Sequence, residues 1–227
     1  MSKKIKILKN GPYQVSAEIP LKQAIIEIDE EGISQHWKDG KDYETNGKTY
    51  MLCRCGHSKN KPFCDGTHVK NGFEGEETAS KEPYLDGCQC YKGETIDILD
   101  NEQFCASMRF CDRGVRAWNA AIKSGNKENR KLAIEEAADC AAGRLTIMEK
   151  DGTIIEPKLP QEIGVIHDTA AVRQGPLWVK GGIEVESSNG ESYEIRNRMT
   201  LCRCGESGNM PFCDTSHMSC SHTIGKD

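Results

Sequence analysis

The sequence predicts an α+β protein in which two small β-rich modules flank a segment of different, mixed α+β character. A motif of the same length occurs twice, at residues 51–68 and 200–217, and such self-similarity indicates a duplicated structural unit. The residues between the two copies show helical periodicity, whereas short alternating segments precede each motif. We therefore expect three parts, at residues 1–75, 76–160 and 161–227.

Composition excludes several classes of protein. The chain has 227 residues and a formal net charge of −5, with acidic and basic residues interspersed, whereas a nucleic-acid-binding surface needs a basic stripe. No apolar run approaches the ~18 residues that span a bilayer, and the polar N-terminus lacks an apolar signal segment. We expect a cytoplasmic protein with no membrane contact. In a reducing compartment its 12 cysteines are more typical of metal ligands than of disulfides.

The repeat extends beyond the cysteines. Both copies share the frame Leu-Cys-Arg-Cys-Gly-x-Ser-x-Asn-x-Pro-Phe-Cys-Asp-x-x-His, and upstream residues 11–15 resemble residues 175–179. An Asn-Gly pair, at residues 46–47 and 189–190, precedes each motif and is typical of a hairpin turn. Segments 183–186 and 193–196, on either side of the second pair, alternate apolar and polar residues. Each copy is predicted to be a small antiparallel β unit that leads into a loop.

The motif brings together four potential metal ligands. Cys53 and Cys55 are two residues apart, so in an extended segment their side chains share a face. Cys64 and His68 are four apart, so on a helix they also share a face, with Asp65 as the predicted N-cap. The second copy repeats this set with Cys202, Cys204, Cys213 and His217.

The spacing favours an iron-sulfur cluster over zinc. Structural zinc sites usually separate paired cysteines by two to four residues, whereas here a single residue lies between them. This spacing suits two thiolates on one iron, with the third cysteine and the histidine on the other. An imidazole ligand raises the potential of a cluster and makes the site sensitive to protons. Zinc in both sites remains the alternative.

The frame from Cys53 to His68 resembles the CDGSH iron-sulfur domain family at every defined position, and the second copy differs only at Thr215, where the family has glycine. The resemblance implies a 2Fe-2S cluster in each copy, held by three cysteines and one histidine, acid-labile and redox-active. It also implies two clusters around a two-fold axis, usually through dimerisation. A duplicated chain would form this pseudo-two-fold arrangement internally, as a monomer. If the glycine supplies an unusual backbone angle, Thr215 would be strained.

The middle segment opens with a polar stretch, residues 76–81, which we interpret as a linker. Helices are predicted at about residues 113–123 and from residue 127 to near Gly143, where Gly125-Asn126 precedes the second helix. A strand is predicted at residues 146–148, before the Asp-Gly turn at 151–152.

Cys105, Cys111 and Cys140, together with Asp100-Asn101, resemble a divergent single-cluster ferredoxin domain. The resemblance implies a third cluster, of the 3Fe-4S or 4Fe-4S type. Only three cysteines match, and a 4Fe-4S cluster normally takes four, so Cys88 or Cys90 is a candidate for the fourth. From the sequence alone we favour the other interpretation, an insert that keeps the fold without a cluster, with its cysteines as small apolar residues.

These observations predict an electron carrier or redox sensor that works with a redox protein partner. One alternative is a donor that transfers clusters to an apo iron-sulfur acceptor, and another is a zinc module for protein binding. No nucleophile–base motif and no phosphate-binding loop is present, so we expect no enzymatic activity.

The loops differ in charge. The first carries His57, Lys59 and Lys61, where the second has Glu206, Gly208 and Met210. Positive charge favours the reduced cluster, so the first cluster should have the higher potential. The four histidines outside the ligand sets are interpreted as ordinary polar residues: His36, His57, His167 and His222.

Overall fold

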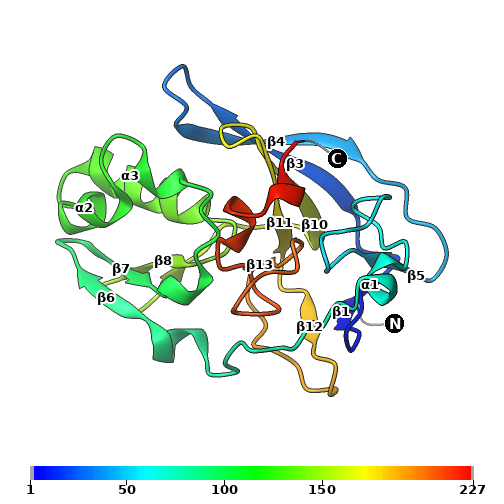
Figure 1. Cartoon of the computed structure of the whole chain (residues 1–227). Helices are drawn as coiled ribbons and strands as arrows, with labels where there is room; N and C mark the ends of the chain where they lie inside the picture. Colours follow the sequence, from blue (N-terminus) through cyan, green and yellow to red (C-terminus); the bar gives the residue numbers. More distant parts are fainter. Residues whose placement is uncertain (1–2, 226–227) are drawn as a thin grey trace.

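The computed structural model describes residues 3–225, so residues 1–2 and 226–227 of the predicted terminal parts lie outside the described residues. We call residues 3–75 the first repeat, 76–160 the insert and 161–225 the second repeat. The chain is mixed α and β, with most of its regular structure in three sheets and few helices (Figure 1). This agrees with the predicted α+β class.

The first sheet has the strand order β12-β1-β2-β5. Its strands are β1 (Lys4–Ile7), β2 (Tyr13–Ser16), β5 (Thr49–Leu52) and β12 (Glu184–Glu186). Strands β1, β2 and β5 pair antiparallel, as expected for a β unit within one copy. The fourth strand, β12, comes from the second repeat and pairs parallel to β1.

The second sheet has the order β13-β11-β10-β3-β4. Its strands are β3 (Leu21–Ile28), β4 (Ser34–Asp42), β10 (Glu162–Asp168), β11 (Arg173–Lys180) and β13 (Arg198–Leu201). Strands β10, β11 and β13 of the second repeat pair antiparallel, and β3 of the first repeat lies parallel to β10. Each sheet therefore contains strands from both repeats.

One hydrophobic core joins the two sheets. Alternate side chains of the strands point into it, because successive residues of a strand face opposite sides. Burial of each large apolar side chain stabilises the fold by about 1.5–3 kcal/mol, so the repeats cannot separate without a large loss of stability. Its buried members include Ile5, Ile7, Tyr13, Val15, Leu21 and Leu52 from the first repeat and Ile163, Val165, Leu177, Val179, Val185 and Leu201 from the second.

The predicted hairpin of the second repeat forms only in part. Gly190 has φ +90°, as the turn requires, and Ser192 pairs with Glu186 in an isolated bridge. The amide of Tyr193 donates to the carbonyl of Val185 at 2.9 Å, but the rest of the predicted strand at 193–196 does not continue the pairing. The chain turns instead toward the insert, where the guanidinium of Arg196 donates to the carbonyls of Ala142 and Gly143.

The insert has its own antiparallel sheet, covered by two helices (Figure 1). Its strands, in sheet order, are β6 (Gln89–Lys92), β7 (Ile96–Asp100), β8 (Leu145–Glu149) and β9 (Ile154–Ile155). The strand predicted at residues 146–148 is β8.

The helices α2 (Ala117–Ile122) and α3 (Lys127–Ala138) are shorter than predicted. The side chain of Asn126 caps α3 by accepting from the amide of Asn129. The helix ends before Gly143 because the buried guanidinium of Arg198 binds the carbonyls of its last residues, Ala137 and Ala138. The carbonyl of Ala137 also accepts from the amide of Cys140 at 3.2 Å, so the last carbonyls of the helix are satisfied from outside it.

The stretch at residues 76–81 is packed and does not behave as a free linker. The amides of Thr78 and Ala79 both donate to the carbonyl of Met210, each at 2.8 Å. The phenol of Tyr193 donates to the carboxylate of Glu77 at 2.8 Å. The start of the insert is thereby fixed against the second motif.

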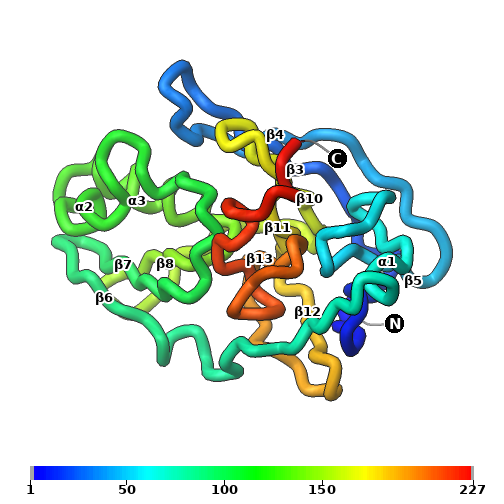
Figure 2. The backbone as a smooth tube through the Cα atoms, viewed as in Figure 1, coloured from blue at the N-terminus to red at the C-terminus, as the bar shows by residue number. Residues whose placement is uncertain are grey.

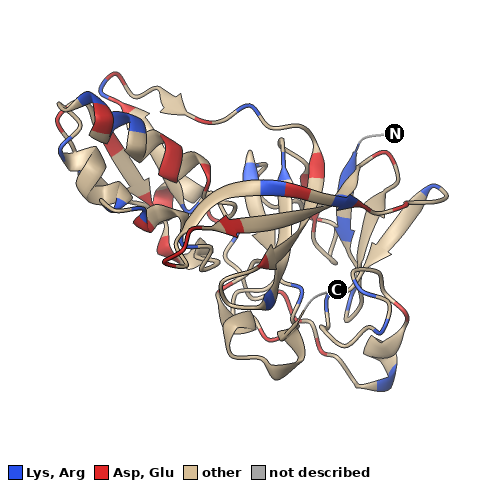
Figure 3. Cartoon of the chain, turned by 90° about the horizontal axis from the view of Figure 1, so that it is seen from above, with Lys and Arg blue, Asp and Glu red and all other residues tan. Residues whose placement is uncertain are grey.

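Acidic and basic residues are interspersed along the insert and are not sorted by sign onto separate elements (Figure 3). Among residues 3–225, no helix has the length and apolar character needed to cross a membrane.

Candidate metal centres

The first motif begins where β5 ends. Cys53 and Cys55 are buried, and their Sγ atoms lie 3.8 Å apart. The loop then folds back, because the amide of Cys53 donates to the carbonyl of Pro62 at 2.8 Å and the amide of Cys64 donates to that of Met51 at 2.9 Å. These hydrogen bonds place the third cysteine beside the first pair.

The third cysteine and the histidine also meet. The Sγ atom of Cys64 lies 3.3 Å from Nδ1 of His68. Asp65 does not cap the helix as predicted, because Gly66 is the N-cap of α1 (Thr67–Lys70). The Asp65 carboxylate instead accepts from the amides of Lys59 and Thr67. It therefore joins the outgoing and returning parts of the loop.

The second motif has the same construction. The Sγ atoms of Cys202 and Cys204 lie 3.6 Å apart, and Sγ of Cys213 lies 3.4 Å from Nδ1 of His217. The amide of Cys202 donates to the carbonyl of Pro211 at 2.8 Å, which matches the bond between Cys53 and Pro62. The only helical element here is a 3-10 turn, Ser216–Met218. The structure thus places the eight predicted ligands as two close pairs in each motif, and the thiols of the two pairs interact electrostatically.

The donor chemistry of both groups suits a metal cluster. All 12 cysteines are free thiols, and each motif contributes three of them, one of which lies beside an imidazole nitrogen. Burial lowers the pKa of His217 to about 4, so at neutral pH its imidazole is uncharged and able to coordinate a metal. Among residues 3–225, its Nε2 atom is one of the few buried side-chain polar atoms without a hydrogen-bond partner.

In each Cys-x-Cys pair, the pKa of the first thiol is lowered. The hydrogen bond from Cys55 lowers the pKa of Cys53 to about 6, and the amides of Ser58 and Gly56 contribute further. The hydrogen bond from Cys204 likewise lowers the pKa of Cys202 to about 7. Because the thiolate is the form that binds metal, this environment favours coordination near neutral pH.

The two sites differ in their exposure to solvent. Cys213 and His217 are buried, with relative exposures of 3% and 2%, whereas Cys64 and His68 are half-buried. The second site is therefore more completely removed from water.

A buried arginine lies between the paired cysteines of each motif. Arg54 donates from Nε to the carbonyl of Gly11 at 2.8 Å, and Arg203 donates to the carbonyl of Gly175 at 3.0 Å. These glycines occupy matching positions in the two repeats. These arginines were not among the predicted site residues, although the same residue stands between the paired cysteines in both copies. Their positive charges offset negative charge on the surrounding thiolates.

The two motif loops touch each other, backbone against backbone. Gly56 and Gly205 follow the second cysteine of each pair and have φ angles of +78° and +86°. A Cβ atom on Gly56 would lie 2.4 Å from the carbonyl oxygen of Cys204, and one on Gly205 would lie 2.7 Å from that of Cys55. No side chain fits at either position without displacing the opposite loop.

The cysteines of the insert form a third group. Cys105, Cys111 and Cys140 line one cavity of about 150 Å³, and burial, with the neighbouring Cys140 and Cys105, raises the pKa of Cys111 to about 12. The two candidates for a fourth ligand do not line this cavity. The thiol of Cys88 donates to the carbonyl of Tyr84, and Cys90 is exposed.

Comparison with known proteins identifies the segments that contain these groups. The family model described as "Iron-binding zinc finger CDGSH type" matches residues 10–69 and 174–218. The model described as "Divergent 4Fe-4S mono-cluster" matches residues 91–150.

The chain is 73% identical over 22 residues to the mouse (Mus musculus) protein named "CDGSH iron-sulfur domain-containing protein 3, mitochondrial". The matched segment is 10% of this chain and 16% of the mouse protein, so it spans less than a fifth of that relative. No solved structure gives a significant match.

Replacement of Thr215 by glycine should stabilise the second motif. Thr215 has φ +79° and Gly66, at the matching position, has φ +82°, a conformation that disfavours β-branched residues. We expect Thr215→Gly to raise the free energy of unfolding by about 1 kcal/mol, measured by urea denaturation. Gly66→Thr should lower it similarly, since a Cβ there meets no other atom within 4 Å. Ser216→Gly is the control and should not stabilise; equal stability of Thr215→Gly and the parent would disprove strain.

Proposed function

Because the chain belongs to the CDGSH iron-sulfur domain family, with two such domains around a divergent ferredoxin-like domain, we propose that it is an electron carrier with a 2Fe-2S cluster in each motif. The observation that supports this most directly is the twofold occurrence of one ligand group, with three thiols and an imidazole nitrogen in each loop. A bound 2Fe-2S cluster supplies one-electron redox chemistry. We propose no enzymatic activity for the chain itself.

We assign the proposed ligands by motif. In each, the Cys-x-Cys pair holds one iron, and the third cysteine and the histidine hold the other. The histidine coordinates through Nδ1, the nitrogen that lies beside the third thiol. The first cluster takes Cys53, Cys55, Cys64 and His68, and the second takes Cys202, Cys204, Cys213 and His217.

We also propose that the two repeats are related by a pseudo-two-fold axis within one chain. The parallel pairing of β1 with β12 has a counterpart in the pairing of β10 with β3. The reciprocal contacts of Gly56 with Cys204 and of Gly205 with Cys55 support the same relation at the metal loops. A single chain would then provide the paired sites without a second copy.

For the insert, we propose a third cluster in the cavity that Cys105, Cys111 and Cys140 line. Three thiolates suit a 3Fe-4S cluster, whereas a 4Fe-4S cluster normally takes a fourth. The cavity also adjoins the second site, since Cys213 packs in one apolar cluster with Met108 and Phe110. The alternative is an insert that retains its fold with the cysteines as packing residues.

A reducing compartment, such as the cytoplasm, fits the 12 free thiols of the chain. The mouse protein is named as mitochondrial, but its match covers too little of either chain to place this one.

Elemental analysis tests the cluster assignment. Protein purified without oxygen should be coloured and contain about two iron and two sulfide per occupied motif. Cys64→Ser should remove iron and sulfide from the first site only, and Cys213→Ser from the second only. Cys111→Ser should lower the iron content only if the insert holds a cluster, and Cys220→Ser, outside all three groups, is the control. A colourless protein that contains zinc and no sulfide would refute the proposal.

The first cluster should have the higher reduction potential. The lysines of its loop favour the added electron, and its half-buried ligands leave the added charge better solvated than at the buried second site. We expect Lys59→Glu to lower the first potential by roughly 20–50 mV, because one exposed charge contributes about 0.5–1 kcal/mol. Potentiometry on Cys213→Ser protein, which isolates the first cluster, measures this change. Equal or reversed potentials of the two sites would contradict it.

Cluster donation is the second candidate function, and the partial exposure of Cys64 and His68 favours it for the first site. Mixing with an apo-ferredoxin should then transfer the first cluster severalfold faster than the second. Spectroscopy on Cys213→Ser and Cys64→Ser proteins reports each site separately. If neither protein loses its cluster while the acceptor is present, electron transfer alone is supported.

A further inference from the structure

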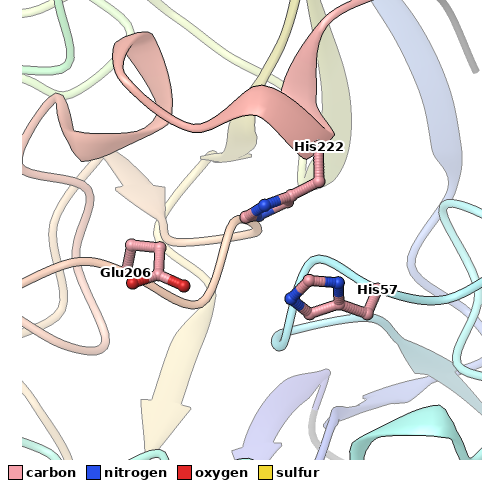
Figure 4. Close-up of side chains that lie close together, drawn as sticks. All are labelled: His57, Glu206 and His222. Atoms are coloured by element: carbon pink, nitrogen blue, oxygen red, sulfur yellow. The ribbon is translucent and has the colours of Figure 1, made fainter. Parts of the chain in front are cut away.

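Three potential metal ligands outside the proposed cluster sites come together where the two motif loops meet (Figure 4). The ligand atoms of His57, Glu206 and His222 all lie within 4.8 Å of one another. His57 follows Gly56 and Glu206 follows Gly205, so they hold matching positions in the two motifs. His222 belongs to a 3-10 turn, Ser221–Thr223, in the C-terminal segment that passes beside the first loop (Figure 2). Its Nε2 atom would lie 2.7 Å from a Cβ on Gly56.

The surroundings of His222 suit a metal ligand. Its Nε2 atom lies 2.9 Å from the carbonyl oxygen of Cys204. A carbonyl oxygen only accepts hydrogen bonds, so Nε2 carries the proton and Nδ1 keeps a free lone pair. Metal-binding histidines commonly have this arrangement, in which a backbone carbonyl holds the opposite ring nitrogen.

The other two side chains can adjust their positions. His57 and Glu206 are exposed, and the rings of His57 and His222 lie 4.5 Å apart between centroids. Ligand atoms around a tetrahedral zinc ion lie about 3.4 Å apart, given bonds of about 2.1 Å. Small rotations of exposed side chains would reach that spacing.

We propose that His57, Glu206 and His222 form a site for a divalent transition-metal ion, with Zn²⁺ as the best match. Two imidazoles and one carboxylate are a known zinc ligand set, and such sets leave a fourth position for water. The ion would join the first loop, the second loop and the C-terminal segment. It would thereby reinforce the contact between the two motifs without using any proposed cluster ligand.

One nearby charge opposes the cation. The ammonium of Lys61 donates to the carbonyl of His222 at 3.2 Å and to Oε1 of Gln174 at 3.0 Å. After burial and His222, the same charge also contributes to lowering the pKa of His57. The site should therefore bind more tightly when this charge is removed.

Equilibrium dialysis of the full chain against Zn²⁺ tests the proposal, with zinc, iron and sulfide measured in the same sample. We expect one zinc ion per chain, bound with no loss of iron or sulfide. His57→Ala and Glu206→Gln should each weaken binding about tenfold or more, and Lys61→Met should strengthen it. His36→Ala is the matched control, because that histidine is exposed on β4 and distant in sequence from both loops.

Equal zinc affinity in the parent, His57→Ala and Glu206→Gln proteins would overturn the proposal. Zinc binding that occurs only with release of iron would also overturn it, since the ion would then occupy the thiol sites. Neither result bears on the cluster assignment, which rests on the iron and sulfide content before zinc is added.

Discussion

The close approach of Gly56 to Cys204 and of Gly205 to Cys55 is the constraint on which the paired arrangement of the motifs depends. At each position the opposite backbone occupies the space of a side chain, because a Cβ there would lie only 2.4 or 2.7 Å from a carbonyl oxygen of the other loop. The two loops can approach this closely only because the sheets beneath them share one apolar core. The pairing of strands from different repeats holds the two loops together, and the glycines allow their backbones to approach closely. Loss of either would separate the two groups of cysteines.

The two copies have diverged around this common frame. Tyr13 of the first repeat donates from its phenol to the carbonyl of Cys202 at 2.8 Å, whereas the matching residue of the second repeat is Leu177, which cannot donate. The stretch after the first motif packs on Met210 of the second, which covers the second site further. At the first loop the matching residue is Lys61, which donates to the carbonyl of His222 in the C-terminal segment, and Cys64 and His68 remain half-buried. Duplication thus produced two similar ligand groups in different dielectric surroundings.

Much of each site could be predicted from sequence, because the ligands lie within 16 residues of one another in each motif and local backbone geometry brings them together. The expected angle at Thr215 also follows from its alignment with Gly66. The parallel pairing of β1 with β12 could not be predicted, since nothing in the alternation of a strand specifies a partner far along the chain. The grouping of His57 with His222 was missed for the same reason. Asp65 was misassigned because the same side chain can cap a helix or close a loop.

The insert is placed asymmetrically with respect to the two motifs, and this bears on how the chain could work. The pKa of Cys213 is raised, and burial is the largest cause. Negative charge on Cys202 and on Cys105 of the insert raises it further. Cys105 is therefore electrostatically coupled to the second site. The apolar cluster around Cys213 includes Phe110, whose ring lies 4.7 Å from that of Trp37, so this junction is buried and apolar. If the insert holds a cluster, its nearest redox neighbour is the buried second site. The first site lies across the contact between the two motif loops, and with Cys64 and His68 half-buried it is the more exposed of the two.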